Sequence, residues 1–154
     1  MSEKTAIRKA TIKDVSRIAE IIIINYRMNF YPYFHNDAFY FRELNVMDMV
    51  SVLCSDEARF NNFYVYDDGV IKGVACITGE LLDKLYVEPQ FQNSGIGAKL
   101  LAFAVKERGA KELWALEYNT RGISFYQRNG FALTGEKIIE DEWVPLLKLV
   151  LTSN

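Results

Sequence analysis

Three apolar segments joined by short turns constrain the fold more than any other feature of this chain. They cover residues 63–66, 70–78 and 81–87. The first two flank Asp67-Asp68-Gly69, and Asp and Gly tolerate the positive φ angles of a hairpin turn. Strands connected this closely run antiparallel. We therefore expect an antiparallel sheet at the centre of the protein.

The rest of the chain adds helices and strands around that sheet. Thr11 and Asp14 match a capping box, and the helix they start runs to about Tyr26. Further helices are expected over 46–54, 95–108 and 120–128, and further strands over 5–9, 112–117, 130–137 and 145–151. The element order is β-α-α-β-β-β-α-β-α-β-β. This predicts one α/β (α+β) domain over residues 1–154, with a mixed, mostly antiparallel sheet of six to seven strands and about four helices.

Composition excludes several classes of function. The chain has 154 residues, enough for one domain, and 18 basic against 20 acidic residues, which argues against a nucleic-acid partner. Its single histidine, His35, does not support a His-rich metal site or a serine-hydrolase triad. Cys54 and Cys76 lie in apolar runs, so we expect two reduced core thiols. We find no signal peptide and no membrane-spanning run, and we expect no metal and a cytoplasmic location.

A glycine-containing segment, Gln92-Asn-Ser-Gly-Ile-Gly97, lies between an expected strand and an expected helix. Backbone N–H groups at such a helix start can bind a phosphate. The segment is not a Walker A loop, because Ala-Lys-Leu follows Gly97, and it is not a Rossmann fingerprint, because position 100 is Leu. By itself it is equally consistent with an ordinary turn.

Two motifs together resemble a known family. Residues 85–101 contain [QR]-x-x-G-x-[GA], the acetyl-CoA signature of the GCN5-related N-acetyltransferases (GNAT), and residues 119–131 resemble the family pattern N-x-x-A-x-x-F-Y-x-x-x-G-F. The resemblance extends over roughly residues 5–150. It implies an N-acetyltransferase that moves the acetyl group of acetyl-CoA directly to a primary amine in a ternary complex. The acceptor is a small molecule or a protein amine, and a catalytically inactive acyl-CoA-binding module is the alternative.

The resemblance also implies a set of site residues. The strand at Leu85, Tyr86 and Val87 would pair with pantetheine, and an N–H near Val87 would polarise the thioester carbonyl. Tyr126 would protonate the leaving thiolate, or is simply a core tyrosine, while Asn119 would hold the pantetheine arm or cap the next helix. The implied cofactor-binding residues are Leu85, Tyr86, Val87, Gln92, Asn93, Ser94, Gly95, Ile96, Gly97, Asn119, Phe125, Tyr126 and Arg128. Gly95 and Gly97 are expected to serve ligand approach alone, so that valine at either position blocks binding and leaves the fold intact.

The general base is open among several carboxylates. Strand alternation puts Asp83 on the face of Leu85 and Val87, and an acid at a strand end is the plain alternative. Glu80, Glu88, Glu117 and a water molecule are the other candidates.

Two departures from the family pattern affect the cofactor loop. Asn93 and Ser94 stand where the family often has glycine and a basic residue, so Lys99 or Arg128 would have to supply the cation unless both are surface charges. Gly122 replaces a family alanine, a change to which we assign little weight.

The segment 30–41 is rich in aromatic residues and is interrupted by Pro32, which predicts a loop or a broken helix. It is equally consistent with an acceptor pocket that holds His35 and with core and dimer contact.

Overall fold

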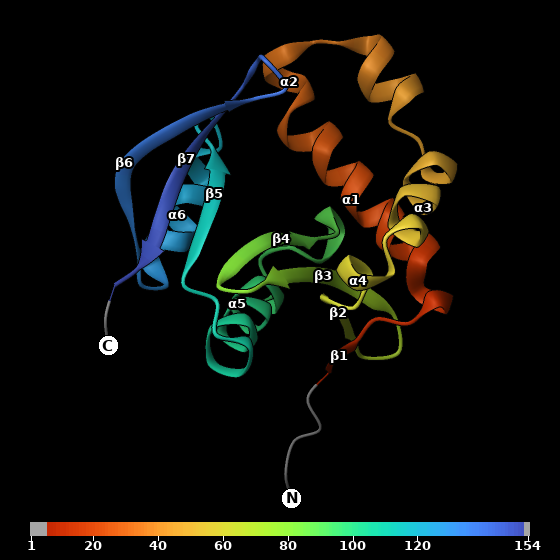
Figure 1. The fold of residues 1–154 in the computed structure, drawn as a ribbon, viewed down its shortest axis with the longest axis horizontal. Coiled ribbons are helices and arrows are strands. Elements are labelled where there is room, and N and C mark those ends of the chain that lie inside the picture. Colours follow the sequence, from red (N-terminus) through yellow and green to blue (C-terminus); the bar gives the residue numbers. More distant parts are fainter. Residues whose placement is uncertain (1–5, 153–154) are drawn as a thin grey trace, which may run out of the picture.

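The computed structural model describes residues 6–152 and contains a seven-stranded sheet in the order β1-β2-β3-β4-β5-β7-β6 (Figure 1). Of the pairs described, β4 and β5 are parallel and the others antiparallel. The predicted fold class and the mostly antiparallel sheet are confirmed. Residue 5, the expected start of the first strand, lies outside the described residues. The strands are β1 (Ile7–Lys9), β2 (Phe63–Asp67), β3 (Ile71–Thr78), β4 (Leu81–Val87), β5 (Glu112–Leu116), β6 (Phe131–Glu140) and β7 (Val144–Leu151).

Four of the described helices are nine residues or longer, as the periodicity predicts. They are α1 (Val15–Asn29), α3 (Val46–Ser55), α5 (Ile96–Arg108) and α6 (Thr120–Arg128). Shorter pieces are α2 (Tyr31–Phe34), α4 (Glu57–Phe60), the 3₁₀ turns η1 (Ile12–Asp14) and η3 (Pro89–Phe91), and the π-helix η2 (Phe39–Glu43). The segment 30–41 is therefore a broken helix. The sequence did not indicate α4, because one turn is too short to show a period.

Hydrophobic side chains cover the two faces of the sheet separately. On one face, Ile18 and Ile22 of α1 and Leu53 of α3 pack against Phe63 and Val74. On the other face, α5 contributes Ile96, Leu100, Leu101 and Ala104. The isoleucine-rich helix is thus core, as expected. Cys76 is buried, but Cys54 is exposed, so the expectation of two core thiols is wrong for Cys54, which follows the last buried position of α3.

The sheet opens between its two parallel strands. β4 pairs with β5 only where Leu81 faces Glu112 and Leu82 faces Leu113, and beyond those pairs the two strands diverge (Figure 1). The β3–β4 register shifts at the same point, because Cys76 faces Lys84 while Ile77 faces Leu82. This leaves Asp83 as the extra residue of a β-bulge. Residues of both diverging strands line a cavity, together with residues of α1, α5 and α6.

Candidate functional site: a cleft between diverging strands

The main cavity has a volume of about 840 Å³ and lies where β4 and β5 diverge. Most of the residues predicted to bind the cofactor line it, as does Asp83. Ser94 and Ile96 do not line it. The predicted residues in the lining are Leu85, Tyr86, Val87, Gln92, Asn93, Gly95, Gly97, Asn119, Phe125, Tyr126 and Arg128.

The end of β4 presents backbone groups to the cleft. Glu88 donates its N–H to the carbonyl of Lys72 on the β3 side, so alternation directs the N–H and C=O of Val87 and Leu85 toward the side that β5 leaves empty. The Val87 carbonyl accepts hydrogen bonds from Asn25 Nδ2 at 3.1 Å and from Gln92 Nε2 at 3.0 Å. The N–H of Val87 therefore faces the cleft, whereas its carbonyl is already occupied by two hydrogen bonds.

Asn25 is a positioning residue that sequence reasoning missed. It is only 3% exposed, and its amide also donates to Ile21 O at 2.9 Å. An asparagine in an isoleucine-rich helix indicates a buried polar contact, but no sequence signal identifies the partner 62 residues away. Gln92, predicted to bind the cofactor, uses its side chain to tie the loop to β4.

The loop after β4 forms a turn that ends at the N-terminus of α5. Asn93 has φ +66° and Gly95 has φ +87°, and the Ser94 hydroxyl donates to Phe91 O at 2.6 Å. The first N–H groups of α5 point out of the helix without intrahelical partners, which favours an anion there. Because Gly95 adopts a left-handed conformation that the turn itself requires, the expectation that it serves ligand approach alone is wrong.

Gly97 differs from Gly95. A Cβ built at Gly97 lies 3.5 Å from Phe125, an ordinary van der Waals distance, and its φ is not positive. The fold therefore leaves room for a methyl group there.

An arginine of α6 contacts this loop. Arg121 Nη2 donates to Asn93 Oδ1 at 2.7 Å, and Arg121 lines the cavity. Lys99 does not line the cavity, and its ammonium stands 6.0 Å from the centre of the Tyr66 ring. Arg128 does line it. The sequence pointed to Lys99 or Arg128, whereas Arg121 hydrogen-bonds to the loop and was missed because 28 residues separate it from Asn93.

At the start of α6, Asn119 uses one end of its amide and leaves the other available. Its Oδ1 accepts the N–H of Gly122 at 3.0 Å, which is the cap expected as the alternative. Its Nδ2 has no hydrogen-bond partner among residues 6–152. A Cβ at Gly122 would stand 2.5 Å from that Nδ2. Glycine at 122 is therefore needed for this Asn119 conformation, a requirement the sequence reading underrated.

Tyr126 lines the cavity, and its hydroxyl has no hydrogen-bond partner within the described chain. Its ring packs edge-on against Phe125, with centroids 5.3 Å apart, and against Phe131. Burial raises the pKa of Tyr126, so the hydroxyl stays protonated at neutral pH. A protonated phenol beside a cavity can donate a proton or a hydrogen bond.

The four candidate carboxylate bases differ in their position relative to the cavity. Asp83 accepts a hydrogen bond from Arg59 Nη2 at 2.6 Å and lies 3.9 Å from Cys76 Sγ. Cys76 belongs to the face covered by α1, whereas Leu85 packs on the opposite face. The prediction that Asp83 shares the face of Leu85 and Val87 is wrong, because the bulge breaks the alternation.

Glu80, Glu88 and Glu117 are outside the cavity lining. They pair with Lys111 at 3.2 Å, Arg17 at 2.9 Å and Lys137 at 2.8 Å, respectively. Asp83 is therefore the only one of the four candidate carboxylates in contact with the cavity.

Residues of the aromatic segment 30–41 contribute both to the core and to the cavity lining. Phe30, Phe39 and Tyr40 line the cavity, and Tyr40 is also fully buried in a small core cluster with Ile23 and Leu44. His35 is exposed and is not part of the lining. The alternative of an acceptor pocket that holds His35 is therefore wrong. Burial raises the pKa of Tyr40 to about 12.

Residues 6–152 contain no helix long and apolar enough to cross a membrane. The same part of the chain has no group of three or more His, Cys, Asp or Glu residues suited to a metal ion.

Comparison with known proteins gives a family match over the central residues. Residues 59–133 match the family model described as "Acetyltransferase (GNAT) domain". The peptidyl-lysine N-acetyltransferase YjaB of Salmonella typhimurium is 32% identical over 80 residues, which are 51% of this chain and 55% of that protein. The chain spans about half of the length of the first curated relatives it matches.

Solved structures share the fold over nearly the whole chain. The PaiA N-acetyltransferase of Thermoplasma acidophilum, in complex with coenzyme A, has a TM-score of 0.65 and 21% identity, with 96% of this chain and 98% of that chain covered. YncA of Salmonella typhimurium, described as a putative acetyltransferase with its cofactor acetyl-CoA, has a TM-score of 0.68 and 20% identity, with 99% and 96% covered.

Proposed function

Because the chain belongs to the GCN5-related N-acetyltransferase family, we propose that it transfers the acetyl group of acetyl-CoA to a primary amine. Residues 1–154 would act as one acetyltransferase domain. The observation that carries the proposal is the divergence of β4 from β5 beside the loop that starts α5. It provides unpaired strand groups for a peptide-like arm and N–H groups for a pyrophosphate within one cavity.

In the proposed complex, pantetheine lies along Leu85 and Val87 as an additional strand. The pyrophosphate binds the N–H groups at the start of α5, and Arg121 supplies the cation that the loop lacks. Asn119 Nδ2 donates to the pantetheine arm, while Phe125 lies beside Gly97 and limits the width of the channel.

The chemical step needs a polarised carbonyl, a neutral amine and a proton for the leaving group. The Val87 N–H polarises the thioester carbonyl. The amine nitrogen forms the new C–N bond while the C–S bond breaks, and the proton lost by nitrogen passes through water to Asp83. The Tyr126 hydroxyl gives its proton to the departing thiolate and regains one from solvent.

Direct attack is favoured over an acetyl-cysteine intermediate. Burial, with a further contribution from Asp83, raises the pKa of Cys76 to about 11, so its thiol is not ionised at neutral pH. Cys54 is not part of the cavity lining. Neither cysteine meets the requirements of a nucleophile.

The test is turnover of acetyl-CoA with a panel of primary amines, measured as released thiol, in wild type and Tyr126→Phe. If Tyr126 is the acid, kcat falls about 100-fold, the lower end for a positioned acid because a thiolate leaves readily. The KM for acetyl-CoA stays unchanged. Tyr64→Phe, which removes a hydroxyl outside the cavity, is the matched control and keeps full activity.

Two results would contradict the proposal in different ways. Full activity of Tyr126→Phe would remove Tyr126 from the chemistry. Heat protection by acetyl-CoA without turnover of any amine would instead support the alternative, an inactive acyl-CoA-binding module.

A further inference from the structure

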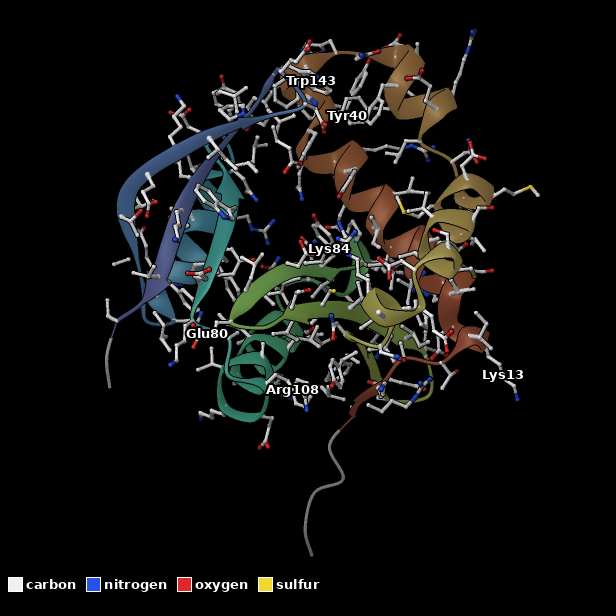
Figure 2. All side chains as sticks on the ribbon, viewed as in Figure 1. Lys13, Tyr40, Glu80, Lys84, Arg108 and Trp143 are labelled. Atoms are coloured by element: carbon white, nitrogen blue, oxygen red, sulfur yellow. The ribbon has the colours of Figure 1, made fainter. Side chains whose placement is uncertain are left out.

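Aromatic side chains from two distant parts of the chain meet at the cavity wall, where Phe39, Tyr40 and Trp143 line it. Phe34 and Trp143 have ring centroids 4.5 Å apart, and Phe39 and Tyr40 lie 6.0 and 6.1 Å from Trp143. Figure 2 shows Tyr40 and Trp143 together near the β6–β7 turn. We call Tyr33, Phe34, Phe39, Tyr40, Tyr118 and Trp143 the aromatic bridge.

A second contact of the bridge joins α2 to the loop between β5 and α6. The Tyr33 and Tyr118 rings stack with centroids 5.2 Å apart. The segment after α1 therefore reaches across the cleft and touches the C-terminal half of the protein at two places.

Apolar side chains make up part of the cavity wall. Besides Phe39, Tyr40 and Trp143 of the bridge itself, they include Tyr26, Phe30, Trp114, Ile138, Val144 and Leu146. Flat rings of this kind bind a flat apolar body through buried area and edge-to-face contacts.

Charged side chains of both signs line the cavity: Asp83, Lys84, Arg121, Arg128, Glu140 and Asp141. Glu140 and Asp141, at the turn, form no ion pair with any described residue. Lys84, on β4, donates to Tyr26 Oη at 3.0 Å. Figure 2 labels Lys84 beside β4. Asp83 is paired with Arg59. Glu140 and Asp141 are therefore the lining carboxylates left to attract an incoming ammonium, and a second positive charge would meet Lys84.

We propose that the acceptor is a small primary amine on a flat apolar body, an arylalkylamine, rather than a lysine of a folded protein or a polyamine. This inference rests on the proposed acetyl transfer. The ring lies under the aromatic bridge, and the amino group reaches the thioester beside Val87. A polypeptide backbone would have to separate the contacts of Trp143 and Tyr118 to enter.

Binding can be measured without catalysis, because the only two tryptophans of the chain, Trp114 and Trp143, both line the cavity. With coenzyme A present, 2-phenylethylamine is titrated against intrinsic tryptophan fluorescence, and n-butylamine, spermidine and a lysine-containing peptide are titrated alongside. We expect a saturable change with 2-phenylethylamine at concentrations roughly 10- to 100-fold lower than with n-butylamine, the gain from burying a ring. Spermidine and the peptide should bind more weakly still.

The same four amines are then compared as acceptors by kcat/KM, in wild type and in two variants. Trp143→Leu opens the bridge, so we expect the preference for 2-phenylethylamine over the peptide to fall at least 10-fold. Phe41→Leu removes a ring of the same segment that packs on Tyr31 and lies outside the cavity lining. This variant should leave the preference among the four amines unchanged. The more conservative Phe39→Leu provides a second test if Trp143→Leu lowers the melting temperature.

The outcomes separate this inference from the proposed function. A peptide or spermidine that is acetylated as well as 2-phenylethylamine by wild type overturns the inference while acetyl transfer stands. Equal affinity for n-butylamine and 2-phenylethylamine also overturns it. Tight binding of 2-phenylethylamine without acetylation of any amine upholds the ligand class and overturns the proposed transfer.

Discussion

At the scale of single residues, Asn119 has two separable tasks. Its Oδ1 caps α6, and its Nδ2 has no hydrogen-bond partner among residues 6–152 while the residue lines the cavity. Asn119→Asp keeps an oxygen for the cap and loses the donor, so the melting temperature should hold while the KM for acetyl-CoA rises roughly 3- to 10-fold. Asn119→Ala should lose both, with about 1 kcal/mol of stability. An unchanged KM in the Asp variant would mean that Asn119 is only a cap.

Arg121 is the second residue whose role can be isolated. If it pairs with the pyrophosphate, Arg121→Ala should raise the KM for acetyl-CoA by about tenfold and leave kcat nearly unchanged, since the contact is the same in ground and transition states. Lys99→Ala removes a charge of the same helix-start region that lies outside the cavity. Steady-state kinetics of both variants test this prediction. An equal rise in the KM for acetyl-CoA in the two variants would refute the assignment to Arg121.

At the scale of elements, the loop before α5 contains two glycines with different requirements. Gly97→Ala fits the fold, because the nearest neighbouring atom lies 3.5 Å from the new Cβ. It should hold or slightly raise the melting temperature while weakening acetyl-CoA binding at least tenfold. Gly95→Ala should lower the melting temperature through about 1 kcal/mol of left-handed strain. Calorimetry of both variants tests this, and unimpaired binding in Gly97→Ala would make the loop an ordinary turn.

The start of α1 contains a pH-sensitive contact. Arg8 donates to both oxygens of Asp14, at 2.8 and 3.0 Å. The hydrogen bond from Arg8 lowers the pKa of Asp14 and outweighs burial, which acts in the opposite direction. A carboxyl whose pKa is depressed by folding stabilises the protein above its unfolded pKa of about 3.8, and this contribution is lost as the pH falls through the folded value.

Asp14→Asn should therefore lower the free energy of unfolding by about 2 kcal/mol near neutral pH, a figure already reduced because Arg8 is 41% exposed. The difference from wild type should shrink below about pH 4. Denaturant unfolding across pH 3–7 measures it, with Glu107→Gln on α5 as a control that forms no described ion pair. A difference as large at pH 3 as at pH 7 would contradict the mechanism.

At the scale of the whole molecule, the proposed cofactor joins two halves of the sheet that contact each other weakly. Acetyl-CoA at 100 times its dissociation constant should stabilise the fold by about 2.7 kcal/mol. For a chain of this size that corresponds to a rise of roughly 5–10 °C in melting temperature. Pantetheine alone, which does not reach the α5 loop, should give a smaller rise. A folded protein that shows no shift with acetyl-CoA would refute the cofactor assignment.

The sequence by itself determined the elements and the positions of Gln92–Gly97, Asn119 and Tyr126 within them. Turn residues, caps and apolar periods act over a few neighbouring residues, so they can be recognised in a single sequence. They placed the order of strands and long helices correctly. They also indicated the cleft between two strands through the resemblance of two motifs.

Only the tertiary structure decided which distant groups meet. The bulge reverses the face of Asp83, Arg121 reaches Asn93 across 28 residues, and Asn25 reaches Val87 across 62. The aromatic bridge likewise depends on Trp143 meeting a segment about a hundred residues earlier. Such contacts depend on how the sheet twists and opens, and no local pattern encodes the partner of a side chain that lies on another element.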